Sequence, residues 1–234
     1  MPTRFWLQAS GSIVPTVNPN FDAGWEQTGS ATRLPMIRKT QASAVTALTN
    51  SSAITVPITT TQQILAYQFV SSEIFLPTRL DTSCLFSLVI RGLENATTNN
   101  VFLAYVLQAF YERKSTAQVT LASSMTNAGT EFAATAATRI FGDGATTVAL
   151  TAATLNEPWR LVLEIGAHAQ APSAAGSFTY RVGSNAASDF ALTSALTTDL
   201  NPWMELSVNL NATTFKNYHA VRVGDGMSCG DRIR

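Results

Sequence analysis

The chain has 234 residues, of which 46% are hydrophobic but only 13% are charged, and its 15 basic and 15 acidic residues give no formal net charge. Ordinary soluble domains carry about 25% charged residues. Because electrostatic nucleic-acid binding needs a basic patch, and the sequence contains no Lys/Arg run, we expect no nucleic-acid partner. At this length one large core is sufficient for stability, without a disulfide, metal or cofactor.

Threonine, alanine and serine take the place of the missing charges. A β-branched side chain such as threonine packs well on a pleated sheet, so the composition favours β-structure. A charge-poor exterior is also typical of proteins whose surface is partly covered by partners, because isolated monomers usually carry more surface charge.

Two cysteines, Cys84 and Cys229, are too few for a disulfide framework, and we expect both to be reduced. Cys84 lies in the apolar run 84–90, which is typical of a small buried hydrophobic side chain. The N-terminus lacks an apolar core of signal-peptide length, and no stretch approaches the roughly 18 apolar residues of a membrane span. The sequence therefore predicts a protein made in the cytoplasm with no membrane partner.

The chain begins with a predicted short strand over 3–8, followed by glycine and prolines between 11 and 19 that interrupt regular structure. The segment Phe21–Glu26, with the sequence FDAGWE, has two aromatic side chains around a glycine-containing turn. We expect it to lie over the body of the protein with Phe21 and Trp25 packed inward, because large aromatic side chains are mostly buried. An exposed aromatic platform for a ligand is the alternative.

Alternation of apolar residues predicts most of the remaining elements. Both faces of 63–70 are apolar, as expected for an inner strand. The runs 83–93 and 101–113, joined by a polar Asn/Thr turn, predict the clearest β-hairpin; a helix over 101–113 is the alternative, but aromatic and β-branched content favours a strand. Further strands are predicted over 34–39, 54–58, 119–121, 146–151, 158–168, 178–182 and 203–208.

This number of strands, with turn signals every 10 to 15 residues or so, predicts an all-β fold. An antiparallel β-sandwich, of the jelly-roll kind, is favoured over a parallel α/β sheet. We predict three regions. Residues 1–40 form an N-terminal strand and extended segment packed on the body, 41–208 form the sandwich, and 209–234 form a tail that serves as an edge strand or an arm to another subunit.

Residues of the kind that catalysis or metal binding requires are not grouped by spacing. His168 and His219 stand alone, without the spacing of a zinc site, and no Gly-x-Ser-x-Gly elbow is present. The turns at 142–144 and 225–226 contain one aspartate each, which turn chemistry explains better than calcium binding. We therefore predict no catalytic, cofactor-binding or metal-binding residues, and no enzyme activity.

Two carboxylates, Glu164 and Glu205, stand out because they lie within otherwise apolar strands. A pair of carboxylates is the machinery of glycoside hydrolysis, so a hydrolase that uses them is one hypothesis. We expect instead that both point outward, or that each pairs with an arginine such as Arg91 or Arg160.

Several short segments together resemble a family of tailed-bacteriophage and prophage virion structural proteins of about this length. The resemblance spans about residues 4–208, none of its motifs is catalytic, and the tail lies outside it. The segments are Phe21–Glu26, Arg33–Leu34, Val162–Gly166, Arg181–Gly183 and Asp199–Ser207, the last with the sequence DLNPWMELS.

The resemblance implies a protein made in the host cytoplasm and located in the virion. We interpret it as a capsid decoration or cement protein, with a neck or tail appendage as the close alternative. Its expected partners are the major capsid protein or neck and tail proteins, together with copies of itself in a homo-oligomer, for which a trimer is one form.

A receptor- or carbohydrate-binding module is a further alternative. It rests on aromatic side chains that would have to face solvent. The candidates are Trp25, Tyr67, Tyr111, Trp159 and Tyr180.

Overall fold

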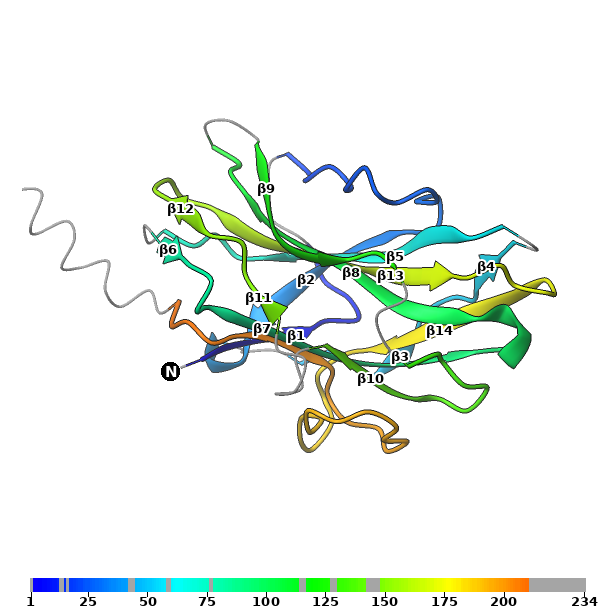
Figure 1. The fold of residues 1–234 in the computed structure, drawn as a ribbon. Coiled ribbons are helices and arrows are strands. Elements are labelled where there is room, and N and C mark those ends of the chain that lie inside the picture. The colour runs from blue at the N-terminus through cyan, green and yellow to red at the C-terminus, as the bar shows by residue number, and fades with distance from the viewer. Residues whose placement is uncertain are drawn as a thin grey trace, which may run out of the picture.

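The computed structural model confirms the all-β prediction (Figure 1). It describes residues 2–12, 15, 17–41, 45–57, 60–75, 78–113, 117–126, 130–141 and 148–210. Within these ranges the regular structure is β-strand apart from two short 3-10 helices, η1 (Lys39–Gln41) and η2 (Thr97–Asn99). The strands are β1 (Thr3–Leu7), β2 (Thr32–Arg38), β3 (Thr49–Asn50), β4 (Ile54–Val56), β5 (Gln62–Ser71), β6 (Thr78–Leu80), β7 (Leu85–Glu94), β8 (Val101–Phe110), β9 (Gln118–Ser124), β10 (Ala137–Phe141), β11 (Val148–Ala149), β12 (Ala153–Leu155), β13 (Arg160–Ala169), β14 (Gly176–Val182) and β15 (Trp203–Leu206).

Most strands belong to one sheet that folds over itself into two layers (Figure 1). One layer follows the order β14–β7–β15–β1, and the other follows β2–β5–β13–β8–β9. The layers join where β1 pairs with β2. Strands β10 and β11 pair with β7, strands β3 and β4 pair with β14, and β6 and β12 form a separate small sheet. Because β2 and β5 run parallel, the sheet is mixed rather than antiparallel throughout.

The predicted hairpin of 83–93 with 101–113 is wrong, although both strands exist. Strand β7 pairs with β10, β11, β14 and β15, whereas β8 pairs with β13 and β9. The chain passes from one layer to the other through η2, and Asn100 then adopts a left-handed conformation with φ of 48°. A short polar connection can therefore join facing layers as readily as neighbouring strands.

The core lies between the layers and is built from alternate residues of the long strands. On β13, Leu161, Leu163 and Ile165 point inward and are fully buried, as are Tyr105 and Leu107 on β8. Burying each such aliphatic side chain stabilises the fold by about 1.5–3 kcal/mol. The alternation predicted for these two strands is confirmed.

Each layer also has a covered outer face. We call residues 19–27 the N-terminal cover and residues 184–202 the C-terminal cover. In Figure 1 the N-terminal cover is the blue segment above β5 and β13, and the C-terminal cover is the orange loop beneath β10. Separate apolar clusters lie under each cover, one around Trp25 and one around Phe190 and Trp203. The covers make both faces of both layers at least partly buried.

Candidate functional site

A fully buried carboxylate holds the N-terminal cover on the sheet. Glu164 lies on β13, between β5 and β8, on the outer face of its layer. Its Oε2 accepts a hydrogen bond of 2.6 Å from the indole Nε1 of Trp25, and both carboxylate oxygens lie within 3.3 Å of the backbone N–H of Asp22. Gln68 Nε2 donates to Oε1 at 2.9 Å. The FDAGWE segment is therefore attached through its backbone and through its tryptophan.

Glutamines of the neighbouring strands extend this polar cluster. Gln68 on β5 also donates to the carbonyl of Asn20 at 3.1 Å, and its own carbonyl accepts from Arg33 Nε at 2.8 Å. Gln108 on β8 donates to Asp22 at 3.0 Å, and Gln118 on β9 donates both to Gln108 at 2.7 Å and to the Asn20 carbonyl at 2.9 Å. Four adjacent strands thus bind one stretch of the N-terminal cover.

Trp25 packs over a glycine that leaves room for its ring. A Cβ atom on Gly166 would lie 2.6 Å from Trp25 Cζ3 and would collide with the backbone carbonyl of Ile64. Trp25 is only 6% exposed, so the predicted inward packing of this side chain is confirmed. Phe21 is partly buried, with the Arg33 guanidinium 4.1 Å from its ring centroid.

Burial raises the pKa of Glu164, and the hydrogen bonds from Gln68, Trp25 and the Asp22 backbone only partly oppose that effect. The donors that reach this carboxylate are neutral, so no opposite charge offsets its removal from water. Glu164 points outward from its sheet, as expected, but the N-terminal cover lies over it. The alternative that it pairs with Arg91 or Arg160 is wrong, because those arginines bind Asp199 and Glu112.

A second carboxylate, Asp189, holds the C-terminal cover in a different way. Its oxygens accept from Arg4 at 3.0 Å, from Lys39 at 2.7 Å and from Trp6 Nε1 at 2.9 Å, and Asn201 Nδ2 lies 3.3 Å away. Desolvation acts to raise the pKa of Asp189, but these hydrogen bonds together hold it below its usual range.

The apolar side of the C-terminal cover packs on β15 and β7. Phe190 lies in a buried cluster with Val89 and Trp203, and Trp203 Nε1 donates to the Phe190 carbonyl at 2.8 Å. Arg4 stacks over the Trp203 ring at 3.8 Å. Thr138 on β10 fastens the cover further, since its Oγ1 donates to the Thr193 carbonyl at 2.8 Å.

The arginines named as partners for Glu164 or Glu205 bind other carboxylates. Arg160 Nε pairs with Glu112 at 2.6 Å, and Arg91 pairs with Asp199. Glu205 instead pairs with Arg4 Nε at 3.0 Å across β1 and β15. These partners come from residues far apart in sequence, so spacing along the chain could not assign them.

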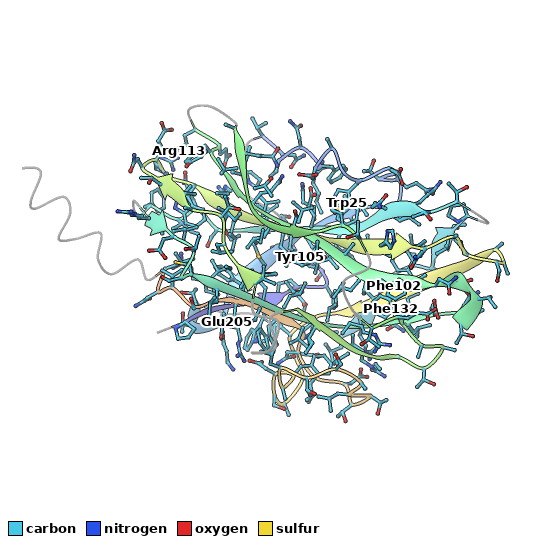
Figure 2. All side chains as sticks on the ribbon, viewed as in Figure 1. Trp25, Phe102, Tyr105, Arg113, Phe132 and Glu205 are labelled. Atoms are coloured by element: carbon cyan, nitrogen blue, oxygen red, sulfur yellow. The ribbon has the colours of Figure 1, made fainter. Side chains whose placement is uncertain are left out.

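The structure does not bring Glu164 and Glu205 together as a catalytic pair. Glu164 belongs to the β2–β5–β13–β8–β9 layer and Glu205 to the other, and each has its own partners. Figure 2 shows Trp25, which donates to Glu164, against the upper layer and Glu205 at the lower one. A two-carboxylate mechanism needs its groups within about 10 Å on one substrate, which this arrangement does not provide.

The aromatic side chains proposed as a ligand platform are mostly buried. Trp159 and Tyr180 are fully enclosed, and Trp25 and Tyr67 are almost so. Burial accordingly raises the pKa of Tyr67 to about 12. Tyr111 alone of the five is half-buried. The alternative of a ligand platform required these side chains to face solvent, and four of them do not, because the covers and the facing layer occupy both sides of the strands.

A third buried carboxylate lies at the end of the sandwich near η2. Glu94 is fully buried and accepts a hydrogen bond from the Val101 backbone N–H at 3.2 Å, while its Oε1 has no hydrogen-bond donor among the described residues. Desolvation, reinforced by the nearby Glu131, raises the pKa of Glu94 to about 7. Arg139 lies close enough to oppose this shift. Sequence reasoning did not single out Glu94, although it ends an apolar strand.

The remaining candidates have local, structural partners. His168 on β13 is buried, with Nδ1 3.2 Å from Gln63 Nε2, and desolvation lowers its pKa. Cys84 is half-buried, with its Sγ 3.9 Å from Asp81. His219, Cys229 and the turns at 142–144 and 225–226 lie outside the described residues. Across the described ranges, His, Cys, Asp and Glu form no group of three or more suited to a metal ion.

Comparison with known protein families, with curated proteins and with solved structures finds no match to this chain. Among the residues that the structure describes, no helix is long and apolar enough to cross a membrane. The structure therefore defines the class of this protein by its fold, which is an all-β sandwich. Each of its two layers is covered by a segment, and a buried or partly buried carboxylate holds each segment in place.

Proposed function

We propose that this chain is a bacteriophage virion structural protein that acts through protein–protein interfaces, and specifically a capsid decoration or cement protein. The observation that carries the proposal concerns the two motifs behind the phage resemblance. FDAGWE belongs to the N-terminal cover, and DLNPWMELS connects the C-terminal cover to β15. The polar residues of both motifs attach the covers to the sheet layers beneath them. This is a structural role, as expected for a virion structural protein.

The distribution of charge supports the same proposal. Most of the described basic side chains have partners within the chain. Ion pairs are formed by Arg4, Lys39, Arg91, Arg113 and Arg160, and Arg139 donates to backbone carbonyls. Among the described residues, threonine, serine, alanine and asparagine are left to dominate the exterior. Such a surface loses little solvation energy when a neighbouring subunit covers it, because few charges must leave water.

Particles purified from the phage or induced prophage that encodes this chain provide the test. Quantitative mass spectrometry should find the chain at a fixed copy number per particle, and cryo-electron microscopy should place it on the capsid. Density at the neck or tail would replace the decoration role by an appendage role. Absence from mature particles would refute the proposal.

A further inference from the structure

A cavity of about 280 Å³ opens beside the start of the chain, where β1, β2 and β15 meet. Its walls include the basic side chains Arg4, Arg38 and Lys39, the carboxylate of Glu205, and Asn209. A water molecule occupies about 30 Å³ in the liquid, so the space is large enough for a small organic acid or an acidic side chain.

Arg38 differs from the other two basic residues because it lies on the inner face of its strand. It shares that face of β2 with the buried Leu34 and Met36, pairs across the sheet with Phe5, and is 5% exposed. Within the described part of the chain its guanidinium has only a distant ring contact, 5.9 Å from the Phe5 centroid. Its Nε is buried and has no hydrogen-bond partner among the residues that the structure describes.

The other charges around the cavity balance one another. Arg4 binds Glu205 and Asp189, and Lys39 also binds Asp189. Among the described residues these two cations and two carboxylates cancel, so Arg38 provides a surplus of one positive charge. Burial lowers the pKa of Arg38, as expected for a charge held away from water without a counterion. An unpaired buried guanidinium is costly, and a bound anion would remove that cost.

We propose that this cavity is a binding site for a single carboxylate group supplied by another molecule, with Arg38 as its principal ligand. The planar guanidinium matches a carboxylate with two parallel N–H···O bonds. The surplus of one charge favours a monoanion, and the neighbouring Glu205 disfavours a phosphate dianion. The site goes beyond the proposed virion role, because it is defined by the cavity and not by where the protein is located.

The full-length chain, labelled with ¹⁵N, provides the test through the Nε–Hε signal of Arg38. Titration with acetate should shift that signal saturably, while chloride at the same ionic strength should not. Arg38→Lys retains the charge but loses the planar fork, and should weaken acetate binding at least tenfold. Arg38→Met should abolish acetate-induced stabilisation and, in carboxylate-free buffer, raise the midpoint of thermal unfolding by about 2–4 °C.

Arg79→Met is the matched control, because Arg79 is exposed and has no ion pair with a described residue. It should leave the acetate titration unchanged. A blocked Gly-Glu-Gly peptide distinguishes the source of the carboxylate. Binding at least tenfold tighter than acetate identifies an acidic side chain on a protein, and equal binding identifies a free acid; both support the site.

Three results would overturn the proposal. Equal shifts with chloride would indicate screening alone, and tighter binding of inorganic phosphate than of acetate would indicate a different ligand class. The third concerns the chain itself. If Asp225→Asn with Asp231→Asn in the full chain shifts the Arg38 signal before any acid is added, the carboxylate is the chain's own and no external ligand is required.

Discussion

The two covers perform the same task with opposite electrostatics. Under the N-terminal cover, Glu164 is fully buried and accepts hydrogen bonds only from neutral donors. Under the C-terminal cover, Asp189 accepts from two cations, and one of them, Lys39, has a side chain that is 49% exposed. In both cases a tryptophan indole N–H completes the set. The N-terminal cover is therefore attached by hydrogen bonds that are shielded from water, and the C-terminal cover by an ion-pair network that is partly exposed to it.

The largest expected effect comes from removing the buried carboxylate. Glu164→Leu leaves three donors without an acceptor, those of Trp25, Gln68 and the Asp22 backbone, so we expect a loss of about 3–5 kcal/mol in the free energy of unfolding. Urea denaturation measures it. Glu205→Leu is the matched control on the other layer, and should cost less than about 1 kcal/mol because its ion pair is partly exposed. Equal losses would contradict the comparison.

Glu94 provides a buried carboxylate outside both covers. Its pKa is raised to about 7 in the folded state, so its neutral form is favoured by folding. Because folding favours the protonated form, Glu94 makes the free energy of unfolding fall as pH rises. Its stabilising contribution is fully present below its ordinary pKa and is lost as pH rises through about 7. The decline in the free energy of unfolding over this pH range is at most about 3 kcal/mol. Glu94→Gln should flatten that decline. An unchanged pH profile of urea unfolding in the variant would contradict this account.

A smaller and more local effect is expected at the second cover. Asp189→Asn removes the charge that Arg4 and Lys39 bind but retains one acceptor for Trp6, so we expect a loss of about 1–2 kcal/mol. Hydrogen exchange should quicken across 184–202 and remain unchanged across 19–27. Faster exchange in both segments would show that the covers are not independent.

The smallest effect concerns the exposed cation. Lys39→Met should cost less than about 0.5 kcal/mol and should reduce the salt dependence of stability, because an exposed ion pair is screened by salt. Thermal unfolding at low and high salt measures both. Glu164 contributes no such dependence, since the described residues that bind its carboxylate are neutral donors. Equal salt dependence of the variant and the parent would argue against the ion-pair role.

Alternation in the sequence was sufficient for the strands and for much of the core. The inward residues of β8 and β13 follow strict period two, and the inner character of β5 follows from apolar residues on both faces. Trp25 was also expected to pack inward. These features are local, so they can be inferred from neighbouring residues alone.

The pairing of strands and of charges could not be inferred in this way. The β7–β8 connection has the length and composition of a hairpin, yet it crosses between layers. Glu164 points outward from its sheet, as expected for a polar residue in an apolar strand, but the N-terminal cover, about 140 residues earlier in the chain, buries it. Glutamines at the centre of apolar strands, Gln68 and Gln108, were the available signal of a buried polar cluster.

The central claim, that carboxylates in opposite electrostatic settings hold the two covers, can be tested with the indole signals of Trp25 and Trp6. Each indole donates directly to one of the carboxylates. On acidification, followed by ¹⁵N NMR, the Trp25 signal should move at a higher pH than the Trp6 signal, because the pKa of Glu164 is raised and that of Asp189 is lowered. A shared midpoint, or Trp6 moving first, would contradict the account.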